Sequence, residues 1–202
     1  LITSSAASDV YKRQPFDLVS LDKISNYVDY IKIASYELLW DKLLIKAART
    51  KKTIIISTGM ATVKEITKAI NILKKNKAKK IIILHCVSSY PTDCMETNLN
   101  SFKFLKKKYK LEIGWSDHSV DELLIYKIYK DYNISLFELH FDLDGKGWES
   151  KMGKFCWTYD KLKNLKRFIQ NEKQIEGKFT KSFSFKEKKE RLFRADPSDG
   201  LR

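Results

Sequence analysis

The chain has 202 residues, a net charge of +14 and 43% hydrophobic residues, a composition that indicates one globular domain and excludes a disordered chain. No apolar run approaches the ~20 residues that cross a bilayer, and the first residues lack the apolar core of a signal peptide, so we predict no membrane partner. The three cysteines form neither a disulfide framework nor a zinc-binding pattern. We interpret them as packing residues or free thiols in a reducing, cytoplasmic compartment.

The positive charge has two interpretations, a nucleic-acid-binding surface or a solvated basic surface. The lysines are spread over predicted helix faces and ends, as in residues 73–77 and 105–108. This distribution favours the solvated surface and predicts no nucleic-acid partner.

Both ends of the chain differ in character from its middle. Residues 1–14 (LITSSAASDVYKRQ) show no periodicity, and we predict a foreign or disordered flank. Residues 15–176 are expected to form the folded domain. Residues 177–202 are expected to be a linker that ends in a foreign tail from residue 195 (ADPSDGLR).

Between these ends, short apolar segments alternate with amphipathic ones. A short helix is predicted between residues 16 and 28, and Thr62 with Glu65 and Ser119 with Glu122 are predicted to form capping boxes. Strands are predicted over residues 30–34, 53–56, 80–86, 111–115 and 134–141, and further helices over 38–49, 62–73, 99–109, 121–132 and 159–170.

This repeat predicts an α/β fold. Strands that are apolar on both faces form parallel sheets covered by helices, as in a doubly wound sheet or a (β/α)₈ barrel. The turn Ser57-Thr58-Gly59 has one glycine, so the dinucleotide-binding fingerprint is absent. Five clear strands are too few to close an eight-stranded barrel.

A polar cluster follows every predicted strand. The carboxyl ends of parallel strands meet at one edge of a sheet, where α/β proteins place their chemistry. Lysine and serine side chains there favour an anionic substrate, and a glutamate can move protons. Two histidines, His118 and His140, suggest a divalent-metal site, with ordinary hydrogen-bonded histidines as the alternative. His85 is predicted to be structural.

Five motifs carry a resemblance to a known family. KIASYE (32–37), ISTGMAT (56–62), LHCVSSYPT (84–92), IGWSDHS (113–119) and FELHF (137–141) occur in the order and spacing that resemble the N-acetylneuraminate (sialic acid) synthase family, over residues 15–194. The resemblance implies a (β/α)₈ TIM barrel, of which this chain would hold about the last five to six β/α units. It also implies a following antifreeze-like domain and a homodimer.

The family condenses phosphoenolpyruvate with N-acetylmannosamine or a related N-acetylated amino sugar, which gives a nine-carbon keto acid and phosphate. By this resemblance Glu37 would be the general acid/base, and His118 and His140 would bind Mn²⁺ or Mg²⁺. Glu149 is a candidate contact for the sugar. The residues expected to bind phosphoenolpyruvate are Lys32, Ser35, Ser57, Ser88, Tyr90 and Ser116.

Departures from the family pattern leave alternatives open. Residues 143–149 (LDGKGWE) differ from the family's usual sequence, so the sugar could be a legionaminic- or pseudaminic-type precursor. The family's first two strands are expected before Pro15, so we expect the chain to be an inactive internal fragment. The alternative functions are another phosphoenolpyruvate–aldose condensing barrel and a non-catalytic basic RNA-binding domain.

Overall fold

The computed structural model describes residues 12–134 and 136–201. It divides into two compact units, residues 1–166 and 167–202. In the first unit, the described residues form one sheet of six parallel strands in sequence order. These strands are β1 (Lys12–Arg13), β2 (Tyr30–Ile33), β3 (Thr53–Ser57), β4 (Lys80–Cys86), β5 (Glu112–Asp117) and β6 (Phe137–Leu139). The sheet curls into a half-barrel, which confirms the predicted α/β class and the partial (β/α)₈ barrel.

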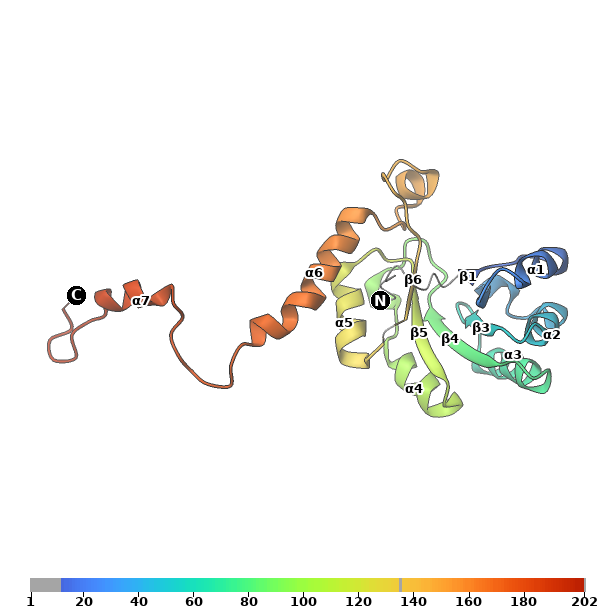
Figure 1. The fold of residues 1–202 in the computed structure, drawn as a ribbon, viewed down its shortest axis with the longest axis horizontal. Helices are drawn as coiled ribbons and strands as arrows, with labels where there is room; N and C mark the ends of the chain where they lie inside the picture. Colours follow the sequence, from blue (N-terminus) through green and yellow to red (C-terminus); the bar gives the residue numbers. More distant parts are fainter. Residues whose placement is uncertain (1–11, 135, 202) are drawn as a thin grey trace. The chain divides into compact units, whose positions relative to one another are not determined.

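Helices follow the strands and lie in order around the outside of the sheet (Figure 1). They are α1 (Leu18–Ser25), α2 (Asp41–Arg49), α3 (Val63–Lys75), α4 (Asn100–Tyr109) and α5 (Glu122–Tyr132). Helix α6 (Tyr159–Glu176) begins in the first unit, and the short α7 (Glu187–Glu190) belongs to the second. Residues 177–201 have exposed side chains throughout.

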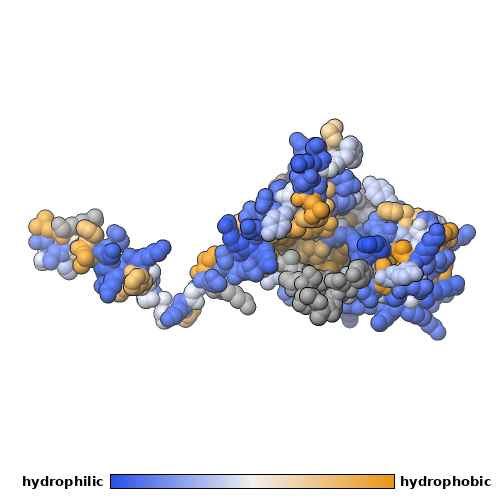
Figure 2. All heavy atoms as spheres, turned by 45° about the horizontal axis from the view of Figure 1, so that its top comes forward, coloured by the Kyte–Doolittle hydropathy of each residue, from blue (hydrophilic) through white to orange (hydrophobic). Residues whose placement is uncertain are grey.

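The strands form because β-branched residues can pack on both faces of a covered sheet. Ile54 and Ile56 of β3 are fully buried, and α2 buries Leu43 and Leu44. The opposite, inner face carries a separate cluster of Ile55, Ile82 and Leu84. On the face drawn in Figure 2, hydrophilic residues are spread over the helices with hydrophobic residues scattered among them.

Most predicted elements occur within one to five residues of their expected bounds, and two details differ. β1 lies inside the predicted flank 1–14 and pairs with β2, with Lys12 opposite Tyr30 and Arg13 opposite Ile31. The strand predicted over 134–141 is shorter, since β6 covers only Phe137–Leu139. No helix of the described residues is long and apolar enough to cross a membrane.

One of the two predicted capping boxes is confirmed. The Thr62 hydroxyl accepts a hydrogen bond from the Glu65 amide, and the Thr62 amide donates to the Glu65 carboxylate. The box predicted for Ser119 and Glu122 is wrong. Asp121 caps α5 by accepting from the Leu124 amide, because the Ser119 hydroxyl donates to Asp117 instead.

Candidate active site

A cavity of about 500 Å³ opens at the carboxyl ends of the strands. Eight of the ten predicted site residues line it: Lys32, Ser35, Ser57, Tyr90, Ser116, His118, His140 and Glu149. Glu37 and Ser88 are not among the lining residues. Each has a buried side-chain oxygen without a hydrogen-bond partner among the described residues.

Strand register explains why the lining residues converge. Lys32 lies opposite Ile55, Ser57 opposite Leu84, and Ser116 opposite both Cys86 and Glu138. Directly opposed residues share a face, as do residues two apart on one strand. Lys32, Ser57, Ser116 and Glu138 therefore all belong to the inner face, away from the helices.

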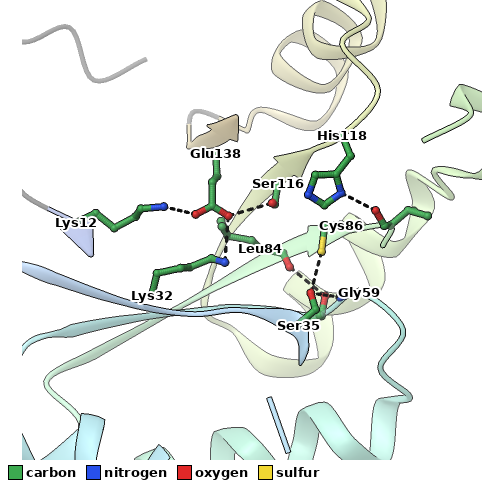
Figure 3. Close-up of polar contacts among 11 residues, drawn as sticks. Lys12, Lys32, Ser35, Gly59, Leu84, Cys86, Ser116, His118 and Glu138 are labelled. Carbon is green, nitrogen blue, oxygen red and sulfur yellow. Dashed lines mark hydrogen bonds and ion pairs between the residues drawn. The ribbon is translucent and has the colours of Figure 1, made fainter. Parts of the chain in front are cut away.

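Glu138 is the centre of a charged network in this cavity (Figure 3). Its carboxylate forms an ion pair with Lys12, lies 3.0 Å from Lys32 Nζ and accepts a 3.0 Å hydrogen bond from Ser116 Oγ. Burial by itself raises the pKa of Glu138, but the charges of Lys32 and Lys12 outweigh it and lower that pKa to about 2. Burial lowers the pKa of Lys32, and Glu138 opposes this effect.

Neither Glu138 nor Lys12 was assigned to the site from the sequence. Lys12 lies in the flank that was set aside. Glu138 could have been placed in the site from the sequence. It precedes His140 by two residues, and strand alternation puts two such side chains on the same face.

Gly59 allows the loop after β3 to approach its neighbours closely. Its amide donates to Ser35 Oγ at 3.0 Å, and Ser35 Oγ lies 3.3 Å from Cys86 Sγ. A Cβ at this position would lie 2.1 Å from Ser88 Oγ and 2.9 Å from Ser35 Oγ. Ser57 is 2% exposed, and its hydroxyl has no partner among the described residues. Because Ser57 lines the cavity, this hydroxyl is available to a ligand.

His118 is oriented by its backbone partner. Its Nδ1 lies 2.8 Å from the Val87 carbonyl oxygen, to which a protonated Nδ1 donates. The other nitrogen, Nε2, then has a lone pair for a ligand or metal. Burial lowers the pKa of His118, which favours this neutral form.

Asp117 holds the turn that presents His118, a role that the sequence did not reveal. The Asp117 side chain is fully buried. Its carboxylate accepts hydrogen bonds from Trp115 Nε1 at 3.0 Å, Trp157 Nε1 at 2.8 Å, Ser119 Oγ at 2.6 Å and the Val120 amide at 3.0 Å. Four donors can stabilise a buried carboxylate, so the β5 end is tied firmly to the segment before α6.

The second histidine lies near the first. The ring centroids of His118 and His140 are 5.5 Å apart, and the Tyr90 ring lies 4.1 Å from that of His118. Burial raises the pKa of Tyr90 to about 12. Glu149 Oε2 is 3.5 Å from His140 Nδ1, so Glu149 belongs to the His140 side of the cavity.

The remaining predictions concern residues with structural roles. His85 Nε2 lies 2.9 Å from the Thr97 carbonyl oxygen, and its ring packs edge-on against Phe102 and Trp115. The structural interpretation of His85 is thereby confirmed. All three cysteines are free thiols, although Cys86 also lines the cavity.

The chain matches a known protein family and several curated proteins. The NeuB family model matches residues 10–181. The chain is 44% identical over 108 residues to an N,N'-diacetyllegionaminic acid synthase of Campylobacter jejuni, a match that covers 52% of the chain and 32% of that protein. It is 34% identical over 162 residues to a pseudaminic acid synthase of the same species, covering 80% of the chain and 47% of that protein.

A solved structure supports the same relationship. The N-acetylneuraminic acid synthetase of Leptospira borgpetersenii, crystallised with citrate, aligns with a TM-score of 0.69 and 30% identity. The alignment covers 90% of the chain and 63% of that protein. The chain thus spans less than half the length of the two curated relatives named above. From the matched residues and the shared half-barrel, the chain belongs to the NeuB family.

Proposed function

We propose that the cavity binds phosphoenolpyruvate and an N-acetylated amino sugar and supports their condensation to a sialic-acid-type nine-carbon keto acid and phosphate. The observation that carries this proposal is that one cavity holds buried Lys32, a Ser57 hydroxyl without a partner among the described residues, and the neighbouring His118 and His140. Two of the named relatives make legionaminic or pseudaminic acid, which supports a sugar of this class.

The lysines and serines at one end of the cavity suit an anion. Lys32 and Lys12 carry two positive charges against the single negative charge of Glu138, which leaves one positive charge for a phosphate or carboxylate. Ser57, Ser35 and Ser116 would add hydrogen bonds. Charge on the departing phosphate would be stabilised by these same donors.

The histidines suit a divalent cation, Mn²⁺ or Mg²⁺ by the family resemblance. His118 has its Nδ1 occupied by a carbonyl oxygen, which leaves Nε2 as a ligand, and His140 faces it across 5.5 Å between ring centroids. When bound, the metal would polarise the aldehyde of the open-chain sugar towards attack by the enol carbon of phosphoenolpyruvate.

Glu37 keeps its proposed role as the general acid/base for the water that adds to the former enol carbon. One buried Glu37 oxygen has no hydrogen-bond partner among the described residues and is available to a ligand, but Glu37 does not line the cavity. To reach a substrate in the cavity, Glu37 would have to move together with the short helix Ser35–Glu37. The homodimer and the sugar contact of Glu149 remain predictions from the resemblance.

Ligand binding tests the proposal without requiring turnover. Lys32→Met removes a charge-assisted contact and should weaken phosphoenolpyruvate binding about 10- to 100-fold in calorimetric titration. The matched control is Lys80→Met, since Lys80 pairs with Glu112 at the opposite end of the strands. Equal affinity in the wild type and Lys32→Met, or equal loss in both variants, would refute the anion site.

A further inference from the structure

A thiol, a carboxylate and an imidazole converge beside the histidine pair. The ligand atoms of His140, Glu149 and Cys156 all lie within 4.8 Å of one another. We infer that these three residues form a metal site that prefers Zn²⁺ or another borderline-soft cation over Mg²⁺. This inference gives Glu149 a metal-binding role in place of the predicted sugar contact. The site shares His140 with the Mn²⁺ or Mg²⁺ site proposed above, so the two cations would be alternative occupants at that imidazole.

The spacing of these atoms fits one small ion. Glu149 Oε2 is 3.5 Å from His140 Nδ1 and 3.6 Å from Cys156 Sγ. A tetrahedral zinc ion with bonds of about 2.0–2.3 Å separates its ligand atoms by about 3.3–3.8 Å. Both separations lie in this range before any side chain moves.

Backbone pairing holds Cys156 beside His140. The Trp157 amide donates to the His140 carbonyl oxygen at 2.7 Å, and the Asp142 amide donates to the Trp157 carbonyl oxygen at 2.9 Å. Phe141 and Trp157 form a parallel bridge, and the Trp157 indole is anchored on Asp117. The two ligands His140 and Cys156 thus lie on adjacent, paired backbone segments.

A compact loop places the third ligand. The Asp142 carboxylate accepts hydrogen bonds from the Gly147 amide at 2.8 Å and from Ser150 Oγ at 2.6 Å. These contacts close the loop directly around Glu149. The carboxylate of Glu149 is therefore positioned by its neighbours on both sides, although its side chain is half exposed.

The ligand types determine which metal is favoured. Thiolate and imidazole ligands suit zinc and cobalt, whereas Mg²⁺ prefers an octahedral shell of oxygens. On binding, the Cys156 S–H bond breaks, a sulfur–metal bond forms, and the proton passes to water. Three protein ligands leave a fourth position for water or substrate, the arrangement of catalytic zinc sites. His118 lies outside this group of three.

Cobalt titration of the full chain tests the inference, because a Co²⁺–thiolate bond produces an intense near-ultraviolet charge-transfer band. We expect the wild type to develop this band with one equivalent of Co²⁺ and Cys156→Ser to lose it. The matched control is Cys94→Ser, which should keep the band because Cys94 lies outside the group. Glu149→Gln should keep the band but bind Co²⁺ about 10- to 100-fold more weakly.

A second measurement needs no variant and guards against misfolding of Cys156→Ser. Zn²⁺ should slow alkylation of Cys156 by iodoacetamide, read by peptide mass spectrometry, while Mg²⁺ should not and Cys94 should react at an unchanged rate. A wild type that lacks the charge-transfer band, a band that persists in Cys156→Ser, or Cys156 alkylation unaffected by Zn²⁺ would overturn the inference. None of these readings depends on phosphoenolpyruvate binding, so failure of the zinc site would leave the anion site proposed above unaffected.

Discussion

The Glu138 carboxylate is the residue on which the charge of the cavity depends. It lies within 3.0 Å of Lys32 Nζ and forms an ion pair with Lys12, and only a fifth of its side chain is exposed. Removing one member of such a buried group leaves the others without compensation. Glu138 therefore both compensates the charges of Lys12 and Lys32 and holds their side chains in the cavity.

The acid stability of the metal-free protein should depend on Glu138. Its folded-state pKa, about 2, is below the ordinary value of 4.5, so the stabilisation is complete above pH 4.5 and is lost as the pH falls towards 2. The contribution is at most about 3 kcal/mol. We expect Glu138→Gln to be less stable at neutral pH and to lose less stability on acidification, as measured by urea unfolding from pH 7 to pH 2. The control is Glu96→Gln at an exposed position, which should show the same dependence of stability on pH as the wild type. If stability fell in parallel with pH in the wild type and in Glu138→Gln, the expectation would be contradicted.

Asp117 is the second residue with a large expected effect. Asp117→Asn replaces one acceptor oxygen with an amide that faces donors such as Trp157 Nε1. The expected loss in free energy of unfolding is about 2–4 kcal/mol, measured by denaturant titration. Asp131→Asn is the control, because Asp131 forms an exposed pair with Lys127 and should cost under about 1 kcal/mol. Similar losses in both variants would show that the four hydrogen bonds carry little stability.

At the scale of elements, the pairing of β5 with β6 depends on a close approach at Gly114. A Cβ there would lie 2.6 Å from Leu84 Cδ2 and 2.7 Å from the Leu136 carbonyl oxygen. That oxygen accepts a 3.0 Å hydrogen bond from the Trp115 amide. Glycine is needed here because any larger residue separates the two strands.

Gly114→Ala should therefore destabilise the protein by about 1–3 kcal/mol through overpacking. The Trp115 amide should also exchange with deuterium faster than in the wild type, since its hydrogen bond to Leu136 is stretched. Asn71→Ala, on the exposed side of α3, is the matched control and should be neutral or slightly stabilising. An unchanged unfolding midpoint in Gly114→Ala would mean that the strands can shift at no cost.

At the scale of the whole molecule, the two units differ in how much they bury. The first unit holds the sheet and the buried core, whereas the side chains of residues 177–201 are exposed. Segments without buried apolar contacts open readily and are cut first by proteases. The 39 lysine and arginine residues are all potential trypsin sites, but most of those in the first unit lie on folded elements.

Limited trypsin digestion should therefore cut first between Lys178 and Arg194. The expected product is a stable fragment that retains all six strands and an unfolding midpoint close to that of the full chain, read by mass spectrometry and thermal melting. A first cut between residues 30 and 141 would contradict this account. So would a fall in the unfolding midpoint of the trimmed fragment.

The order of elements could be predicted from the sequence because it depends on local patterns. Apolar runs such as Ile54–Ile56, amphipathic segments such as Val63–Lys75, and the Thr62–Glu65 capping box are all encoded within a few residues. The β/α repeat then implies a parallel sheet, and strand alternation places Lys32, Ser57 and Ser116 on one edge. The individual roles of the site residues came from the family resemblance, and eight of the ten residues line the cavity.

Which side chains pair with one another at the carboxyl edge of the sheet could be learned only from the tertiary structure. Lys12 and Glu138 are 126 residues apart, and no local pattern states that they pair. The same is true of Trp157 with Asp117 and of Cys156 with Glu149 and His140, because they meet through the course of a loop and the register of separate strands. The sequence by itself determined the fold class, the repeat and the edge that carries the chemistry, since these arise from periodicity. Only the tertiary structure decided which charges neutralise one another and which ligands converge, since these depend on strand register and on the course of the loops.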